Sequence, residues 1–295
     1  MPLSTYTRLT NLISIRDVMT PIQGVIPASA TLQEAIDLAD SFGVGDSGLP
    51  YLVGSGDELI GSVSYWDIRE AIEIGVGNTM DERVVRPINP NLIVTADTPL
   101  WRATALLMRA AGDLDIWFVI DGHEVVGTLT YRDLFKPPFR LCLLAMTFEL
   151  EQLSLRLCQR NAKTNWSALT EGRQQNAEKA MRRAQERREP TRASERVNHL
   201  RAHPALLLEY TTFIDKKTIL IKRGLLPSIR RDVITETFDS AEELRNRCAH
   251  PDSGDEAFID DPKELLRNVQ ACHVVLAKIK DVLERKEAET GPEAE

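Results

Sequence analysis

The hydrophobic pattern changes character once along the chain, close to Lys136. Before that point, short apolar runs of strand length alternate with amphipathic stretches and are separated by turn residues. After it the strand pattern stops, and hydrophobic residues recur at helical spacing over long segments. We therefore predict an α+β chain in two parts, a mixed front part followed by an all-α helical bundle.

The front part contains an internal repeat. Residues 61–67 (GSVSYWD) and 127–133 (GTLTYRD) align residue for residue at a separation of 66. Each copy predicts the same order of elements, β-α-β-β-α, and the first helix opens with a capping box of Thr31 and Glu34. The predicted strands are residues 24–26, 49–53 and 59–64 in the first copy, and 92–94, 116–120 and 124–130 in the second.

The repeated segment resembles a tandem pair of CBS domains, a Bateman module, over residues 12–136. The resemblance rests on the β-α-β-β-α order, on residues 17–21 (DVMTP) at the beginning, and on a Gly-x-x-Ser/Thr-x-x-Asp signature in both copies. It implies two repeats, residues 12–76 and 77–136, that form a nucleotide-sensing module. The implied regulatory ligand is an adenine nucleotide: AMP, ADP or ATP.

Two pairs within the signatures are the candidate nucleotide-binding residues. Ser64 with Asp67, and Thr130 with Asp133, each place a hydroxyl and a carboxylate three residues apart at a predicted helix start. Such a pair can simply cap the helix. The same geometry can receive a phosphate at the helix N-terminus, and the resemblance then assigns both hydroxyls to phosphate and both carboxylates to ribose. We favour the second pair, because Arg132 lies beside it.

The back part is predicted to be a bundle of about five helices that follows a pair of prolines. Its predicted helices are residues 139–159, 164–188, 205–223, 226–249 with a break at 239–240, and 262–286. Residues 288–295 are expected to form a flexible acidic tail. The third helix is expected to end at Gly224.

Composition and charge narrow the class of protein. With 43% hydrophobic and 27% charged residues, the chain is not wholly disordered, and no apolar run is long enough to span a membrane. The beginning lacks the layout of a signal peptide, and the four cysteines show no CxxC spacing, so we expect a reduced, cytoplasmic setting. The net charge of −8 is concentrated in the front part, which mildly disfavours a polyphosphate ligand. Residues 173–201 carry a basic excess that either meets phosphate or forms a solvated helix face.

A compact polar group stands before Pro251. On an unbroken helix Arg245 and His250 would diverge, since each residue turns about 100°. A residue before proline is pushed away from helical angles, so His250 is expected to begin a turn and swing back toward the Arg245 guanidinium. Asn246 directly follows the arginine.

Residues 139–286 resemble the HEPN superfamily, helical domains marked by Arg-x4-6-His, often with Asn after the Arg. The resemblance implies metal-independent RNA cleavage, in which the ribose 2′-OH attacks the adjacent phosphate. His250 would be the general acid/base, Arg245 would hold the phosphate and Asn246 would position the groups. It also implies a homodimer in which two motifs face each other, with RNA as a partner, no cofactor for catalysis, and a role in stress or anti-phage defence.

Two alternatives to RNA cleavage by the helical part remain open at this point. Arg245 can pair with a carboxylate of the first helix, Glu149 or Glu151, and the helical part then serves dimerisation or recruitment in a non-catalytic nucleotide sensor. A metal site is disfavoured, because the residues near in type lack paired ligand spacings. These residues are Cys248, His250, Cys272 and His273. His199 and His203 are four residues apart, but they lack an acidic partner, and Pro204 would break the helix that carries them. An enzyme requires the Arg and His in an open, basic cleft, whereas a scaffold buries them in ion pairs.

Overall fold

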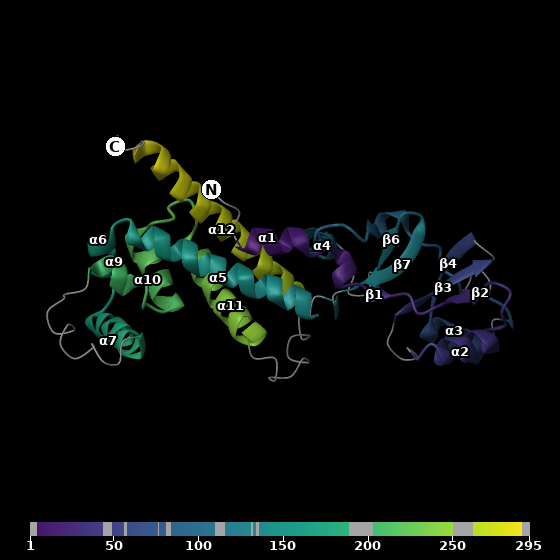
Figure 1. Cartoon of the computed structure of the whole chain (residues 1–295). Coiled ribbons are helices and arrows are strands. Elements are labelled where there is room, and N and C mark those ends of the chain that lie inside the picture. Colours follow the sequence, from purple (N-terminus) through teal and green to yellow (C-terminus); the bar gives the residue numbers. More distant parts are fainter. Residues whose placement is uncertain are drawn as a thin grey trace. The chain divides into compact units, whose positions relative to one another are not determined.

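The computed structural model describes residues 5–43, 49–55, 58–75, 77–80, 84–109, 116–130, 132–133, 136–188, 203–249 and 262–290. The chain divides into two compact units, both drawn in Figure 1. One unit is Thr10–Phe139, and the other joins Met1–Leu9 to Arg140–Glu295. In sequence, the mixed α/β unit is therefore inserted between two segments of the helical unit.

The mixed unit holds two sheets that repeat the same strand order. In the first, β2 (Val25–Pro27) runs parallel to β3 (Pro50–Ser55), which pairs antiparallel with β4 (Glu58–Ser64). In the second, β5, β6 and β7 pair in the same way. The remaining elements are β5 (Ile93–Thr95), β6 (Trp117–Asp121), β7 (Glu124–Leu129), α2 (Leu32–Ser41), α3 (Tyr65–Glu73), α4 (Leu100–Arg109) and the 3-10 turns η1 (Ile15–Asp17) and η2 (Pro90–Leu92). The predicted strands are confirmed within two residues at each end.

The two sheets exchange their leading segments. β1 (Thr20–Pro21) lies in the first repeat, before β2, but pairs antiparallel with β7 of the second, where Thr20 lies opposite Thr128. In return, Arg86 lies in the second repeat, before β5, and bridges Ser62 on β4 of the first through two backbone hydrogen bonds of 2.8 Å each. Each sheet is thus completed by a segment that belongs, in sequence, to the other repeat.

The signature glycines are what allow this exchange. A Cβ on Gly61 would lie 2.4 Å from the carbonyl oxygen of Arg86, and one on Gly127 would lie 2.8 Å from that of Thr20. Both distances are too short for any side chain, so only glycine lets the crossing backbone approach. The glycine of the repeated signature therefore has a packing role in both copies.

Capping and burial explain the helices of the mixed unit. The predicted capping box of Thr31 and Glu34 is present at α2, and that of Ser64 and Asp67 is present at α3. The apolar faces of both helices close over the first sheet, where Ile26, Val53 and Ile68 are fully or almost fully buried. The first repeat thus has its own hydrophobic core.

The helical unit is built from helices of five to 29 residues. They are α1 (Thr5–Leu12), α5 (Pro137–Gln159), α6 (Ala162–Trp166), α7 (Glu171–Arg188), α9 (Pro204–Leu208), α10 (Phe213–Arg223), α11 (Arg231–Ala249) and α12 (Pro262–Thr290). α11 packs against both α10 and α12 (Figure 1). Phe213 and Phe238 stack at this junction, with ring centroids 4.7 Å apart. Among the described residues, none of the helices is long and apolar enough to cross a membrane.

Two predicted helices are each divided in the structure. The stretch predicted at 164–188 forms two helices, α6 and α7. The break between them leaves backbone carbonyl groups without helical donors, and two side chains of α10 donate to such groups. Lys222 donates to the Ala168 oxygen at 3.0 Å, and Arg223 to that of Thr164 at 2.6 Å. The stretch predicted at 205–223 is α9 and α10, because Thr212 and Asp215 form a capping box that starts a new helix.

The other boundaries of the helical unit follow the prediction more closely. Gly224 ends α10 in the left-handed conformation, as predicted. α11 begins at Arg231 rather than at 226 and continues through 239–240, so the predicted break there is wrong. α5 begins at Pro137, since proline is tolerated in the first turn of a helix. α12 reaches Thr290 and so includes the start of the predicted tail.

Candidate functional site

The second signature pair is buried and fully engaged. The Thr130 backbone N–H donates to Asp133 Oδ2 at 2.6 Å and its hydroxyl donates to the same oxygen at 3.1 Å. The Arg132 N–H donates back to Thr130 Oγ1 at 3.2 Å, so the pair caps the turn that it opens. The Arg132 side chain is exposed beside it. Asp133 itself is only 1% exposed.

The other oxygen of Asp133 is held by residues that the sequence analysis did not select. Asp133 Oδ1 accepts the Thr20 hydroxyl at 2.8 Å and pairs with Lys136 Nζ at 2.7 Å. The same ammonium group donates to the Met19 carbonyl oxygen at 2.9 Å and to Thr20 Oγ1 at 3.0 Å. The three-residue spacing from Asp133 to Lys136, one helical turn, was the available signal for the lysine. Thr20 comes near only through the exchanged strand β1.

A narrow cleft lies beside this group. It is lined by the β1 segment with Thr20, by Pro50 and Tyr51 at the start of β3, and by Thr128 of β7. Its volume is about 10 Å³, room for about one water molecule. Ligand pockets typically measure several hundred Å³. In this arrangement, which we call the closed form, the cleft is too small for a nucleotide. A nucleotide would enter only if the walls of the cleft separated.

The first signature pair has the same capping geometry in a more open setting. The Ser64 hydroxyl donates to Asp67 Oδ2 at 2.6 Å, and the Asp67 N–H donates to Ser64 Oγ at 3.0 Å. Asp67 Oδ1 pairs with the guanidinium of Arg86 at 2.6 Å. The side chain of Arg86 is 74% exposed, against 36% for Lys136. In both repeats, one carboxylate oxygen accepts from the backbone N–H and hydroxyl of the signature Ser or Thr, and the other meets a cation of the same chain.

The mixed unit also has a roomier hollow that the sequence did not indicate. It measures about 410 Å³ and lies where the start of α2, near Thr31 and Gln33, meets Ile72 on α3 and Asn78 beyond it. Neither signature pair lines it. Of its lining residues the sequence analysis singled out only Thr31, and that as a helix cap, so no ligand-binding motif pointed to the hollow.

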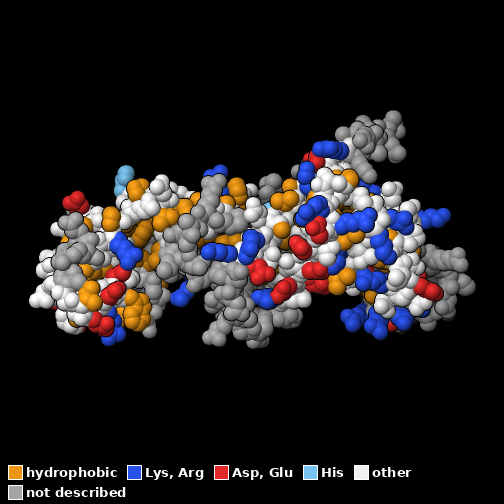
Figure 2. Space-filling view, turned by 180° about the vertical axis from the view of Figure 1, so that it is seen from behind, with side chains coloured by type: hydrophobic (Ala, Val, Ile, Leu, Met, Phe, Trp, Pro, Cys, Tyr) orange, Lys and Arg blue, Asp and Glu red, His pale blue; other side chains and the backbone are white. Residues whose placement is uncertain are grey.

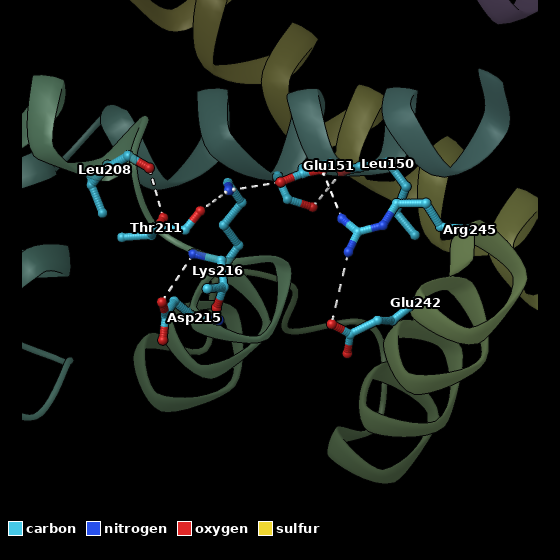
Figure 3. A network of polar contacts seen from close by, with 10 residues as sticks. Leu150, Glu151, Leu208, Thr211, Asp215, Lys216, Glu242 and Arg245 are labelled. Carbon is cyan, nitrogen blue, oxygen red and sulfur yellow. Dashed lines mark hydrogen bonds and ion pairs between the residues drawn. The ribbon is translucent and has the colours of Figure 1, made fainter. Parts of the chain in front are cut away.

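In the helical unit, Arg245 lies in an ion-pair network (Figure 3). Its guanidinium is 3.5 Å from Glu151 Oε2 on α5 and 4.0 Å from Glu242 Oε1 one turn earlier on α11. It also lies over the ring of Phe213, 5.9 Å from the centroid. Glu151 pairs in addition with Lys216 Nζ on α10, at 3.0 Å. The pairing of Arg245 with Glu151 is the arrangement that the scaffold alternative predicts.

The rest of the predicted catalytic group is only partly described. Asn246 is exposed on α11, next to Arg245. His250 lies outside the described residues, so its approach to the guanidinium stays a prediction. Glu149, the other candidate partner of Arg245, instead pairs with Lys280 at 2.6 Å.

The residues considered for a metal site have other surroundings. Within the described ranges, no three His, Cys, Asp or Glu side chains cluster as metal ligands would. Cys272 is fully buried, and burial raises the pKa of its thiol to about 12. The imidazole of His273 lies 2.8 Å from the Tyr6 hydroxyl, and burial lowers its pKa.

Comparison with known families identifies the front part. Residues 15–74 and 80–137 each match the CBS domain family. The chain therefore carries tandem CBS domains, followed by a helical region. The search of the curated proteins found no match.

Several solved structures are similar to the front part. A putative acetoin utilization protein (AcuB) from Vibrio cholerae is 18% identical, with 41% of this chain and 87% of that chain covered and a TM-score of 0.32. The CBS domain of a bacterial CNNM/CorC family Mg²⁺ transporter in complex with ATP is 18% identical, with 45% and 92% covered and a TM-score of 0.35. A conserved CBS domain protein of unknown function from Thermoplasma acidophilum is 17% identical, with 45% and 75% covered and a TM-score of 0.32.

Proposed function

We propose that the chain is an adenine-nucleotide sensor in which the tandem CBS domains bind the nucleotide and the helical unit transmits the signal. CBS domains commonly bind adenine nucleotides. The observation that carries the proposal is the buried Asp133 carboxylate beside a cleft, with the Thr130 hydroxyl at the same helix start. The carboxylate suits ribose hydroxyls, which are donors, and the hydroxyl and nearby Arg132 suit a phosphate.

Ligand binding to the full chain tests this proposal directly. Isothermal titration with adenosine, AMP, ADP and ATP, with GMP as the control base, should give a measurable affinity for at least one adenine compound. A bound ligand at 100 times its Kd stabilises the fold by about 2.7 kcal/mol, which raises the Tm. Asp133→Asn and Asp67→Asn should each be titrated, because the pair that binds loses affinity. Equal stabilisation of wild type and both variants, or none in any of them, would refute the assignment.

For the helical unit we propose a non-catalytic output, namely dimerisation and partner recruitment. Arg245 is half-buried among two carboxylates, an acidic setting that opposes the approach of a phosphodiester. On α5, Leu141 and Phe148 are 48% and 50% exposed and lie two turns apart on one face. This apolar face supports a homodimer through the helical unit. Phe148→Glu should then produce monomers in light scattering, whereas a wild-type chain that is already monomeric would refute the dimer.

RNA cleavage is the second candidate output, and two observations favour it. The contacts of Arg245 with its carboxylates are long, which leaves its donors available, and Asn246 is exposed beside it. In addition, basic side chains gather over α7 (Figure 2), where Lys179, Arg183 and Arg187 are exposed. Such a face suits a phosphodiester backbone.

Incubation with RNA separates the two outputs. Wild type, Arg245→Ala and His250→Ala should be incubated with total RNA in EDTA, with and without AMP or ATP. A ribonuclease cleaves RNA as wild type and loses cleavage in both variants. Identical RNA profiles for all three proteins would exclude cleavage and leave the recruitment function.

A further inference from the structure

The four acceptor positions of Asp133 are all occupied by groups of its own chain. A carboxylate accepts about four hydrogen bonds. Asp133 receives four donors, two from Thr130 on Oδ2, and Thr20 and Lys136 on Oδ1. Nothing is left for the hydroxyl groups of a ribose. A nucleoside can therefore bind this carboxylate only if one of these donors leaves.

We propose that Lys136 is a built-in competitor, which occupies the place of the ribose on Asp133 in the closed form and is displaced by the ligand. The inference rests on the proposed nucleotide-binding function of this site. The donors from Thr130 are fixed, because its backbone N–H and hydroxyl are held within the short turn of Thr130, Arg132 and Asp133. Lys136 is the movable donor, because its long side chain is 36% exposed and its ammonium group can return to water.

The first repeat shows a weaker form of the same arrangement. Among the described residues, Asp67 is met by three donors, two from Ser64 and one from Arg86. The guanidinium of Arg86 is largely exposed, and such surface ion pairs contribute only about 0–1 kcal/mol. Lys136, in contrast, is held by Asp133, Thr20 and the Met19 carbonyl oxygen together. Lys136 should therefore compete with a ribose for Asp133 more strongly than Arg86 competes for Asp67.

Displacement of Lys136 by a ligand would also affect the chain beyond the site, because of where this residue lies. The lysine, near the end of the second CBS domain, is bonded to Met19 and Thr20, near the beginning of the first. It directly precedes Pro137, the first residue of α5. Displacement by a ligand releases this tie, so occupancy of the site loosens the chain where it passes from the CBS pair into the helical unit.

The test compares Lys136→Met with wild type in the full chain, using adenosine and AMP as separate probes. If the closed form holds about nine tenths of the molecules, removing the competitor tightens adenosine binding roughly tenfold. Arg86→Met is the matched control in the other repeat and should change the affinity by less than about twofold, as expected for an exposed ion pair. Lys136→Arg keeps the charge and should resemble wild type, which guards against a simple folding defect.

Hydrogen exchange supplies a second measurement. Backbone amides of residues 15–24 and 136–145 should exchange faster when adenosine is added to wild type, and faster without ligand in Lys136→Met. Unchanged or weaker adenosine binding in Lys136→Met overturns the inference. So does a loss of AMP affinity with adenosine unaffected, because Lys136 would then be a phosphate ligand. Absence of nucleoside and nucleotide binding in every variant would instead refute the proposed function itself.

Discussion

Lys216 is the most deeply buried cation of the helical unit among the described residues, and its removal gives the sharpest test of the network in Figure 3. Its side chain is 2% exposed, and its ammonium group donates to Glu151 Oε1 at 3.0 Å and to the Thr211 carbonyl oxygen at 2.7 Å. Lys216→Met keeps the length of the side chain and removes the charge and the donors. Two acceptors then lose a partner.

The expected cost is about 2 kcal/mol. A buried carbonyl oxygen that loses its donor costs about 1–3 kcal/mol, and Thr211 is only 6% exposed. The loss of its ammonium partner costs Glu151 less than it would cost a fully buried carboxylate. The Glu151 side chain is 21% exposed and still pairs with Arg245 at 3.5 Å. The desolvation cost of the ammonium group, which the variant no longer bears, offsets part of the loss.

Urea unfolding followed by circular dichroism measures this cost, and hydrogen exchange of peptides from α10 assigns the transition to the helical unit. Lys217→Met is the matched control, since Lys217 pairs with Asp239, whose side chain is 54% exposed. It should cost under about 1 kcal/mol. Adding Glu151→Gln to Lys216→Met should recover part of the loss, because the unpaired negative charge is removed. A cost for Lys216→Met no greater than that of the control would refute the reasoning.

Three further predictions concern other parts of the molecule. Gly127→Ala should destabilise the CBS pair by more than about 2 kcal/mol in urea unfolding, because its Cβ meets the exchanged strand, whereas Gly172→Ala, with open space around it, should not destabilise. Burial, followed by the charge of Lys280, lowers the pKa of His273 below its ordinary value of 6.5. On acidification the unfolded chain therefore binds this proton before the folded chain does. The stability of the fold, fully present above pH 6.5, is lost progressively below it. The Tm of wild type should thus fall more steeply from pH 7.5 to 5.5 than that of His273→Gln. Burial raises the pKa of the Cys158 thiol to about 12, so iodoacetamide at pH 8 should label it only after denaturation, and fast labelling of the native chain would contradict its burial.

Local signals in the sequence were sufficient for most of the fold. Strands recur in the same order in two copies, and the Thr31 and Ser64 capping boxes mark helix starts without help from tertiary contacts. The break before α10 was also marked, by Thr212 and Asp215, but the apolar residues on either side suggested one continuous helix. The break before α7 carries no comparable signal, since it depends on Lys222 and Arg223 reaching back from another helix.

The candidate site could be predicted only in part, for the same reason. Asp133 and Thr130 stand in a motif, but Thr20 reaches them through a strand exchange that spans more than a hundred residues. The short Arg-x4-His motif indicated a partner for Arg245 within the same motif. The structure pairs the guanidinium with Glu151 on α5, one of the two carboxylates named as its alternative partner, while His250 lies outside the described residues.

The exchanged strands also set an order of events during synthesis. β1 is made early, yet its partner β7 leaves the ribosome more than a hundred residues later. In the same way, the hydrogen bond between Tyr6 and His273 can form only after α12 has been made. The nascent chain therefore carries unpaired β1 backbone until β7 emerges and an undocked α1 until α12 emerges, and we expect the newly made protein to depend on chaperones over that period.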